Sequence, residues 1–275
     1  MKKYYASRSS RIWAYRRIAD SPLPSVVKKK VKAIYTKLFF AKKIHTGEGV
    51  MQFGEVGLAY PNYNVLAYLF SEIFLDSIYF FETKSQNPRI IDLGANIGLT
   101  TIFFKMLYPA AEITAIEASP GTFSYLEKNT GDLDGIELIN KAASDKIGNV
   151  EFFSVRNELG DGQNSVFRMD NYHNASEQVP TFLLSEIITE NLDLLKIDIE
   201  GGELAVFRDL KAHNSLKYVD KIIMEYHHRQ CGVEGLNFIL ETLEESGFQY
   251  SFADCQDAPA WDEPMNTMMI YAQKK

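Results

Sequence analysis

Short apolar runs alternate with stretches of helical periodicity through most of the chain after residue 85. Runs rich in Ile, Leu and Val are typical of buried strands. Five such runs predict strands, at residues 89–92, 112–116, 136–140, 192–199 and 219–224. Helices are predicted between and after them, at 99–108, from Pro120 onward and at 236–245. Strands that alternate with helices indicate the α/β class, with a mainly parallel, doubly wound sheet covered by helices on both faces.

Two later parts of the chain depart from this alternation. The stretches 150–155 and 165–169 are compatible with strands and flank a glycine turn at 160–162, which predicts a hairpin-like insertion. Near the C-terminus, 248–252 and 267–272 are predicted as strands joined by a long loop. We expect these last two strands to extend one edge of the sheet.

The first 60 residues form a separate pattern. Apolar positions recur at helical spacing near residues 25–40, after Ser25, which can cap a helix. These positions are Val27, Val31, Ile34 and Leu38. The stretch from Gly47 to Pro61 is predicted as a loop. We therefore expect a basic, largely helical N-terminal extension at 1–60, with a helix near 25–40, and an α/β domain at 61–275.

Charge divides the chain in a similar way. Residues 1–45 carry 13 Lys and Arg and a single acid, a formal charge of +12, whereas residues 46–275 carry 16 basic and 35 acidic side chains, a charge of −19. The acidic part would repel a polyanion, so a nucleic-acid substrate is not expected. Three interpretations of the basic extension stay open: contact with an anionic membrane surface, contact with an anionic glycan, or packing against the acidic domain of the same chain or a partner subunit.

The composition of the chain bears on where in the cell the protein is located. Of the 275 residues, 46% are hydrophobic and 24% are charged, as in soluble globular proteins. Two cysteines are too few for a disulfide framework, and no apolar run reaches the roughly 18 residues of a membrane span. We expect a cytoplasmic protein without a secretory signal, with peripheral contact at the inner membrane surface as the one alternative.

The most informative stretch lies where the first strand of the sheet meets its first helix. It reads Asp92-Leu93-Gly94-Ala95-Asn96-Ile97-Gly98, and glycines there allow a tight turn with close backbone approach to a ligand. Glu117 stands nineteen residues beyond Gly98, after the second strand, where an acid typically accepts hydrogen bonds from ribose hydroxyls. Together, the turn and the acid predict a ligand that contains adenosine.

The residues of the turn also discriminate between adenosine-containing ligands. A dinucleotide site requires G-x-G-x-x-G, because its pyrophosphate binds exposed N–H groups at the helix N-terminus. Here the turn reads G-A-N-I-G, and Asp92 is a poor neighbour for a pyrophosphate but suits a cationic ligand such as S-adenosylmethionine. The alternative is a purely structural turn in which Asp92 caps the next helix, and it leaves Glu117 unexplained.

Five blocks of the sequence stand in the order that one family shows: IIDLGANIGLTT (90–101), AIEASPGTFSYLEKN (115–129), AASDKIGNVEFF (142–153), LLKIDIEGGELAVF (194–207) and IIMEYH (222–227). On these blocks the chain resembles the FkbM family of S-adenosylmethionine-dependent O-methyltransferases, over about residues 85–255. The resemblance implies a seven-stranded, Rossmann-like class I methyltransferase sheet and S-adenosylmethionine as cofactor. It also implies methyl transfer to a hydroxyl of a sugar, a glycan or glycolipid, or a natural product.

The predicted cofactor-binding residues combine the turn, the ribose acid and positions implied by the resemblance. They are Asp92, Gly94, Ala95, Asn96, Gly98, Glu117, Ser119, Ser144, Asp145 and Asp198. Ser119 follows the ribose acid and would border the adenosine. Ser144 and Asp145 would contact the adenine on the strength of the resemblance, and a simple turn explains this pair equally well.

Charged residues on the fourth strand carry the predicted chemistry. Lys196, Asp198 and Glu200 alternate with apolar residues and therefore share one face. Charges on a central parallel strand are costly, so both acids are expected at its carboxyl end, in the cleft. We predict Asp198 beside the methionine part of the cofactor or the acceptor hydroxyl, and Glu200 in binding or orienting the acceptor. A salt bridge with Lys196 or a helix cap is the alternative for these acids.

An alcohol acceptor must lose its proton during in-line methyl transfer. His227 follows the fifth strand, and histidine is a natural base near neutral pH, so His227 is our candidate base and Asp198 its rival. Glu203 is predicted only to favour the dipole of the following helix. His227, His228, Asp198 and Glu225 together could suggest a metal site, but their spacing matches no zinc signature, and no metal ion is predicted.

Two other classes of function share parts of this pattern. A nicotinamide-dependent oxidoreductase has a similar sheet but requires the missing G-x-G-x-x-G turn. A non-catalytic binding protein that retains the fold would show a degraded turn or lost strand-end acids, whereas Asp92, Gly94, Gly98, Glu117 and Asp198 are all present. The expected partner is a small-molecule or glycan acceptor, and homo-oligomer formation stays open.

Overall fold

A computed structural model describes residues 11–41, 47–53, 56–154, 175–253 and 267–275. Its centre is a seven-stranded sheet in the order β11-β12-β10-β9-β3-β4-β5. The strands are β3 (Arg89–Leu93), β4 (Glu112–Ile116), β5 (Ile136–Ile139), β9 (Leu192–Ile197), β10 (Val219–His227), β11 (Phe248–Ala253) and β12 (Thr267–Lys274). β12 runs antiparallel to both of its neighbours, while β10, β9, β3, β4 and β5 are parallel. The predicted fold class is confirmed.

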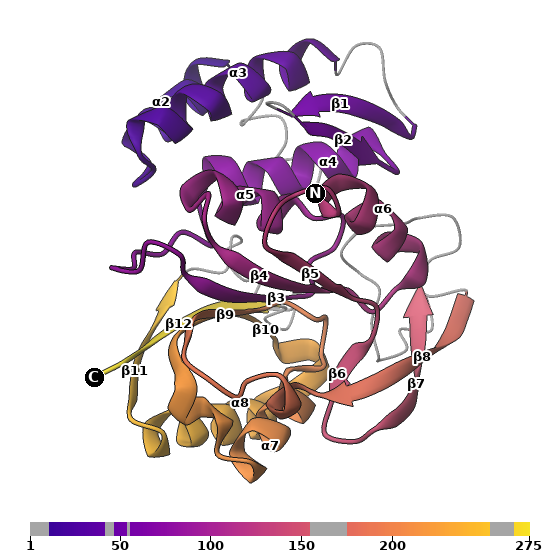
Figure 1. Cartoon of the computed structure of the whole chain (residues 1–275), viewed down its shortest axis with the longest axis vertical. Coiled ribbons are helices and arrows are strands. Elements are labelled where there is room, and N and C mark those ends of the chain that lie inside the picture. The colour runs from indigo at the N-terminus through magenta and orange to yellow at the C-terminus, as the bar shows by residue number, and fades with distance from the viewer. Residues whose placement is uncertain (1–10, 42–46, 54–55, 155–174, 254–266) are drawn as a thin grey trace, which may run out of the picture.

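Helices cover both faces of this sheet (Figure 1). α4 (Tyr63–Phe70), α5 (Leu99–Leu107) and α6 (Pro120–Thr130) lie on one side, and α7 (Glu203–Ala212) and α8 (His228–Glu245) on the other. The start of α6 follows the prediction, because the Ser119 side chain accepts a hydrogen bond from the N–H of Thr122 and Pro120 begins the helix. α8 begins earlier than predicted, at His228, with a short helical segment that is separated from the predicted helix by a kink at Gly232, where φ is 67°.

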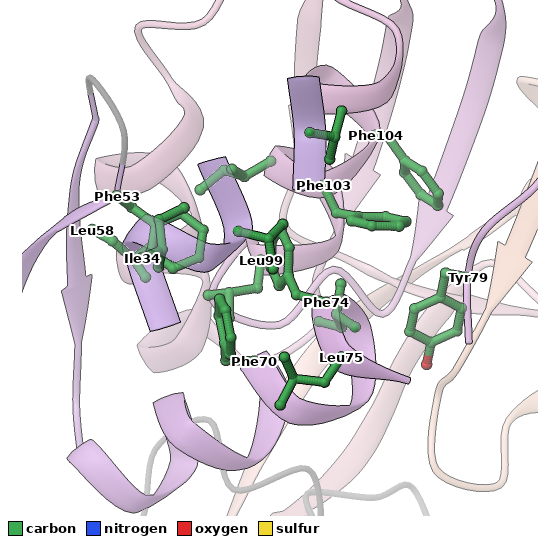
Figure 2. Close-up of a cluster of buried hydrophobic side chains, with 14 of the residues drawn as sticks. Ile34, Phe53, Leu58, Phe70, Phe74, Leu75, Tyr79, Leu99, Phe103 and Phe104 are labelled. Carbon is green, nitrogen blue, oxygen red and sulfur yellow. The ribbon is translucent and has the colours of Figure 1, made fainter. Parts of the chain in front are cut away.

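The N-terminal extension packs outside α4 and α5, on the same side of the sheet (Figure 1). Its described part begins with α2 (Arg11–Asp20), which the sequence did not predict, and α3 (Ser25–Ala41), which is the predicted helix. Ile34 of α3 lies in one buried cluster with Phe53, Phe70 and Phe103 (Figure 2). α3 therefore packs in cis against the rest of the chain through its apolar face, while a domain boundary at residue 60 stays a prediction.

A hairpin occupies the stretch that was predicted as a loop between Gly47 and Pro61. It is formed by β1 (Gly49–Phe53) and β2 (Val56–Tyr60), which pair antiparallel. Side chains alternate between buried and more exposed along both strands, as expected for a hairpin with one face on a core. Asn129 of α6 accepts the N–H of Ala59 at 2.7 Å and donates to its carbonyl at 2.9 Å. The hairpin is thereby fixed to α6.

The insertion after β5 forms a small three-stranded sheet in the order β6-β8-β7. Its strands are β6 (Ala142–Ser144), β7 (Gly148–Ser154) and β8 (Ala175–Leu183). β7 corresponds to the predicted strand at 150–155, whereas the predicted strand at 165–169 lies outside the described residues. β8 was missed because its first half is polar and Pro180 interrupts it. Within the described ranges, none of the helices combines the length and the apolar character needed to cross a membrane.

Candidate functional site

The turn between β3 and α5 lies at the carboxyl ends of the parallel strands, against the end of β9. Gly94 and Gly98 have φ angles of 81° and 90°, in the left-handed region that glycine enters without strain. A Cβ on Gly94 would lie 1.7 Å from the backbone oxygen of Asp198. The N–H of Asp198 in turn donates to the carbonyl of Leu93 at 3.0 Å. The two strand ends meet through backbone atoms, so position 94 requires glycine.

Glu117 lies beside this turn, where the sequence predicted a ribose acid. One of its carboxylate oxygens accepts the N–H of Asn96 at 3.0 Å and the other accepts the N–H of Ser119 at 2.9 Å. Burial raises the pKa of Glu117 to about 7, although these two hydrogen bonds act to lower it. The backbone bonds fix the carboxylate and leave each oxygen with a further lone pair for a hydroxyl of a ligand.

Asp92 lies beneath the turn rather than in it. Its carboxylate is fully buried, accepts a hydrogen bond from Thr101 Oγ1 at 2.7 Å and lies 3.2 Å from Lys196 Nζ. Lys196 also donates to the carbonyl of Gly94 at 2.7 Å. Lys196, which was not among the predicted site residues, therefore connects Asp92 to the turn and holds the turn in place. Direct contact between Asp92 and a ligand stays a prediction.

Asp198, Glu200 and His227 converge beyond the end of β9, at the end of β10. His227 Nε2 lies 3.3 Å from Glu200 Oε2 and 4.0 Å from Asp198 Oδ1. On the other side of the ring, His227 Nδ1 lies 2.7 Å from Glu203 Oε1. Burial lowers the pKa of His227, but the carboxylates of Glu203 and Glu200 outweigh it and hold this pKa well above its usual value. Glu203, for which only a helix-dipole role was predicted, therefore orients the ring.

β10 extends three residues further than predicted, to His227. Glu225 and His227 are two residues apart on this strand, so their side chains share one face. Burial raises the pKa of Glu225 to about 7, and the nearby charge of Asp198 adds to this effect. Glu225 was not among the predicted site residues, although alternation along a longer strand would have indicated it.

A small pocket lies between the turn and the segment that follows α4. Gly94, Ala95, Asn96, Lys196 and Asp198 line it from the sheet side. Four side chains cover it from the other side. Leu69 belongs to α4, Glu72 and Ile73 belong to the π-helical turn η1 (Ser71–Leu75), and Tyr79 follows that turn. These residues leave about 30 Å³, the space of one water molecule, so a larger ligand requires the cover to move.

Tyr79 links the cover of the pocket to Asp198. Its hydroxyl donates to Asp198 Oδ2 at 2.9 Å, and its ring lies at the edge of the aromatic cluster of Phe74 and Phe104 (Figure 2). Burial raises the pKa of the neighbouring Glu72 carboxyl to about 8. Neither Tyr79 nor Glu72 carried a sequence signal, because both precede the blocks that resemble a known family.

The remaining predicted residues lie near the turn or apart from it. Gly98 begins α5 with its positive φ, and Ser119 caps α6. Ser144 and Asp145 lie at the end of β6, outside the residues that line the pocket, and the Asp145 carboxylate is 4.0 Å from Arg208 Nη1 of α7. Contacts of these four residues with a cofactor stay predictions.

Known proteins are similar to this chain over much of its length. Residues 92–250 match the Methyltransferase FkbM domain. Methyltransferase 1 of Beauveria bassiana is 27% identical over 235 residues, which are 76% of this chain and 89% of that protein. The 2-O-methyltransferase NoeI of Sinorhizobium fredii is 27% identical over 137 residues, 44% of this chain and 56% of NoeI. The crystal structure of Methyltransferase FkbM from Methylobacillus flagellatus KT aligns over 98% of this chain and 60% of that one, with a TM-score of 0.45 and 14% identity.

The matched domain covers more than half of the chain and contains the elements of the site described above. It begins at Asp92, includes the glycine turn and Glu117, and extends past Asp198 and His227. The donor set of this site, with the Glu117 carboxyl group beside a glycine turn and the Asp198 carboxylate facing the pocket, fits an adenosyl ligand with a cationic end. The chain belongs to the FkbM family of methyltransferases, and its cofactor is S-adenosylmethionine.

Proposed function

We propose that this protein is an O-methyltransferase that acts on a hydroxyl of a sugar, a glycan or glycolipid, or a natural product. The observation that carries the proposal is the convergence of Asp198, Glu200 and His227 beside the turn at Gly94. A histidine with two carboxylates can hold a hydroxyl and accept its proton. The name of one relative, 2-O-methyltransferase, supports oxygen as the acceptor atom.

Side chains in and beside the pocket have separate roles in holding the cofactor. Glu117 accepts hydrogen bonds from the ribose hydroxyls, and the backbone at Gly94 allows close approach. The carboxylate of Asp198 lines the pocket and attracts the cationic ammonium and sulfonium groups. Glu72 also lines the pocket, and a cationic ligand there would favour its ionised form. When bound, S-adenosylmethionine supplies an electrophilic methyl group on a positively charged sulfur.

Proton removal is assigned to the side chains at the ends of β9 and β10. As the acceptor oxygen gains its methyl group in line with the departing sulfur, its proton passes to the protein. Glu203 holds the ring of His227 so that Nε2 faces Asp198 and Glu200. His227 is the proposed proton acceptor, Asp198 its rival, and Glu200 orients the acceptor. Because the neighbouring carboxylates hold the pKa of His227 well above its usual value, His227 accepts this proton only after it has lost its own proton at Nε2.

Replacement of His227 tests this assignment. His227→Ala is expected to lower kcat by about 100-fold to 10,000-fold, the usual contribution of a general acid–base group, while the affinity for S-adenosylmethionine changes little. The assay follows transfer of a radiolabelled methyl group to a panel of saccharides, lipid-linked saccharides and phenolic natural products. Mass spectrometry then identifies the methyl ether that is formed.

His213→Ala is the matched control, because His213 also pairs with a carboxylate, that of Asp209 at 2.9 Å, but does not belong to the cluster of His227, Asp198 and Glu200. Near wild-type turnover in His227→Ala would remove His227 from the mechanism. No transfer by the wild type to any hydroxyl, with intact cofactor binding, would favour the alternative of a non-catalytic binding protein. The oxidoreductase alternative is set aside by membership in a methyltransferase family.

We also propose that the basic extension holds the protein against the anionic inner surface of a membrane, beside a lipid-linked acceptor. Lys29, Lys30 and Lys37 of α3 are exposed. Phe40 is 55% exposed, and the guanidinium of Arg11 lies 5.2 Å from the centre of its ring. Exposed basic and aromatic side chains together are typical of helices that lie on anionic lipid surfaces.

Charge reversal on α3 tests this contact. Lys29→Glu/Lys30→Glu is expected to reduce co-flotation with phosphatidylserine vesicles by at least about tenfold, because each basic side chain near such a surface contributes about 1 kcal/mol. Lys141→Glu/Lys146→Glu, which reverses two exposed lysines elsewhere on the chain, should float like the wild type. Equal flotation of all three proteins would contradict the proposal.

A further inference from the structure

Three atoms of the kind that bind metal ions face one another at the ends of β9 and β10. They are Nε2 of His227 and one carboxylate oxygen each of Asp198 and Glu200, all within 4.8 Å of one another. Donor atoms that lie about 2.1 Å from a common ion are about 3 to 4 Å apart. The separations of 3.3 Å and 4.0 Å from Nε2 to the two carboxylates are therefore close to those of a formed site. We propose that these three side chains bind a divalent transition-metal ion.

A second, independent feature lies behind the histidine ring. Glu203 is fully buried, and its Oε1 accepts a hydrogen bond from Nδ1 of His227 at 2.7 Å. Glu203 is itself fixed, because Gly201 N–H donates to it at 3.1 Å and Cys231 Sγ at 3.2 Å. With one proton held at Nδ1, the ring turns Nε2 toward the two carboxylates, and a metal ion would take the place of the proton on Nε2. This carboxylate–histidine arrangement is the usual outer-shell support of a metal-binding histidine.

The acidic side chains around the site also favour the binding of a cation. Asp198, Glu200 and Glu225 interact electrostatically at the ends of β9 and β10. The nearest lysine described, Lys196, lies 3.8 Å from Asp198 but also pairs with Asp92 at 3.2 Å. Buried carboxylates are stable when they are paired or bound to a metal ion. A dication between Asp198 and Glu200 would replace the positive charge that His227 gives up when its Nε2 becomes a ligand.

The donor set indicates which ions fit and what they would do. One imidazole with two carboxylates suits Mn²⁺, Fe²⁺ or Zn²⁺ better than Ca²⁺ or Mg²⁺, which prefer oxygen ligands alone. Three protein ligands leave coordination positions open, as in catalytic metal sites. Asp198 and Glu200 have side chains 26% and 23% exposed, so the open positions face the cleft. The spacing of the sequence did not predict this site because its ligands come from two different strands.

The role of the ion in catalysis rests on the proposed function. An acceptor hydroxyl bound to the ion has a lowered pKa, so its proton leaves to water more readily as the new C–O bond forms and the S–C bond breaks. In the metal-loaded protein His227 would hold the ion instead of accepting the proton, and the loss of turnover expected for His227→Ala would then follow from loss of the ion. Turnover without the ion is expected to be lower than with it. Binding of the ion itself does not depend on the identity of the acceptor.

The site is tested with metal alone. The full-length protein is treated with EDTA, dialysed and titrated with MnCl₂ without S-adenosylmethionine, while free Mn²⁺ is followed by electron paramagnetic resonance. One saturable ion per chain is expected. Glu200→Gln, a conservative change at a partly exposed side chain, should abolish this binding, and Glu203→Gln should weaken it by about 10-fold to 100-fold. Thermal unfolding of each variant confirms that it is folded.

His213→Ala serves as the control, since its ring pairs with Asp209 outside the three-ligand cluster and its loss should not change Mn²⁺ binding. No stoichiometric binding of Mn²⁺ or Zn²⁺ by the wild type, or wild-type binding by Glu200→Gln, would overturn the metal site. Calorimetric titration with S-adenosylmethionine separates this failure from that of the proposed function. Cofactor binding and methyl transfer without metal would defeat only the metal site, whereas metal binding without methyl transfer would defeat only the proposed function.

Discussion

Glu117→Ala is expected to reduce the affinity for S-adenosylmethionine by at least about 100-fold, because two hydrogen bonds from the ribose hydroxyls to a charged acceptor are lost. The carboxylate is held in place before the ligand arrives, by the N–H groups of Asn96 and Ser119. Isothermal titration calorimetry on the full-length protein measures the change. Affinity within a few-fold of the wild type would remove Glu117 from the cofactor site.

The same residue predicts a dependence of cofactor affinity on pH. Hydrogen bonds from the ribose require the ionised form of Glu117, whose pKa is about 7 before the ligand binds. Affinity should therefore be full above pH 7 and fall as the pH is lowered through 7, by up to about tenfold per pH unit. Glu117→Gln keeps the size of the side chain but does not titrate, so it should bind more weakly at pH 8 and lose this dependence. A pH profile shared by the wild type and Glu117→Gln would assign the titration to another group.

Gly94→Ala, which adds a single methyl group, is expected to lower the free energy of unfolding by more than about 3 kcal/mol. The added Cβ would lie 1.7 Å from the backbone oxygen of Asp198, and backbone atoms cannot turn aside as a flexible side chain can. Relief of the overlap would separate the ends of β3 and β9. Denaturant titration measures the loss, and cofactor binding should decrease with it because Asn96 and Asp198 move apart.

Gly247→Ala separates this overlap from the cost of backbone strain. Gly247 has nearly the same φ as Gly94, 82° against 81°, but no atom lies within 4 Å of a Cβ built on it. Only the strain of a left-handed alanine applies there, about 1 kcal/mol. Equal losses in the two variants would show that β3 and β9 do not require close approach at position 94.

The sheet was predicted from local patterns because each strand and helix is specified by its own residues. Apolar runs gave β3, β4, β5, β9 and much of β10, and Ser119 with Pro120 gave the start of α6. The prediction failed where local residues do not determine the structure. β8 is polar along its first half, and the hairpin of β1 and β2 was predicted as a loop because its glycines resemble turn residues.

Within the site, the turn and Glu117 could be predicted because their spacing along the chain is set by one strand, one helix and the next strand. The partners of His227 could not be predicted in this way. Glu203 lies 24 residues before His227 in the chain, on α7, and it reaches the ring only because α7 packs beside the end of β10. The contact of Tyr79 with Asp198 spans 119 residues and follows from the packing of the segment after α4 over the turn.

The sequence by itself therefore determined the fold class, the membership in the FkbM family and the position of the adenosine-binding turn, because these depend on residues that are near one another in the chain. Only the tertiary structure decided which acids surround His227, that Tyr79 and Glu72 cover the pocket and that α3 packs its apolar face on the rest of the protein. These features arise where separate elements meet, and the burial that brings them together involves residues from the whole chain.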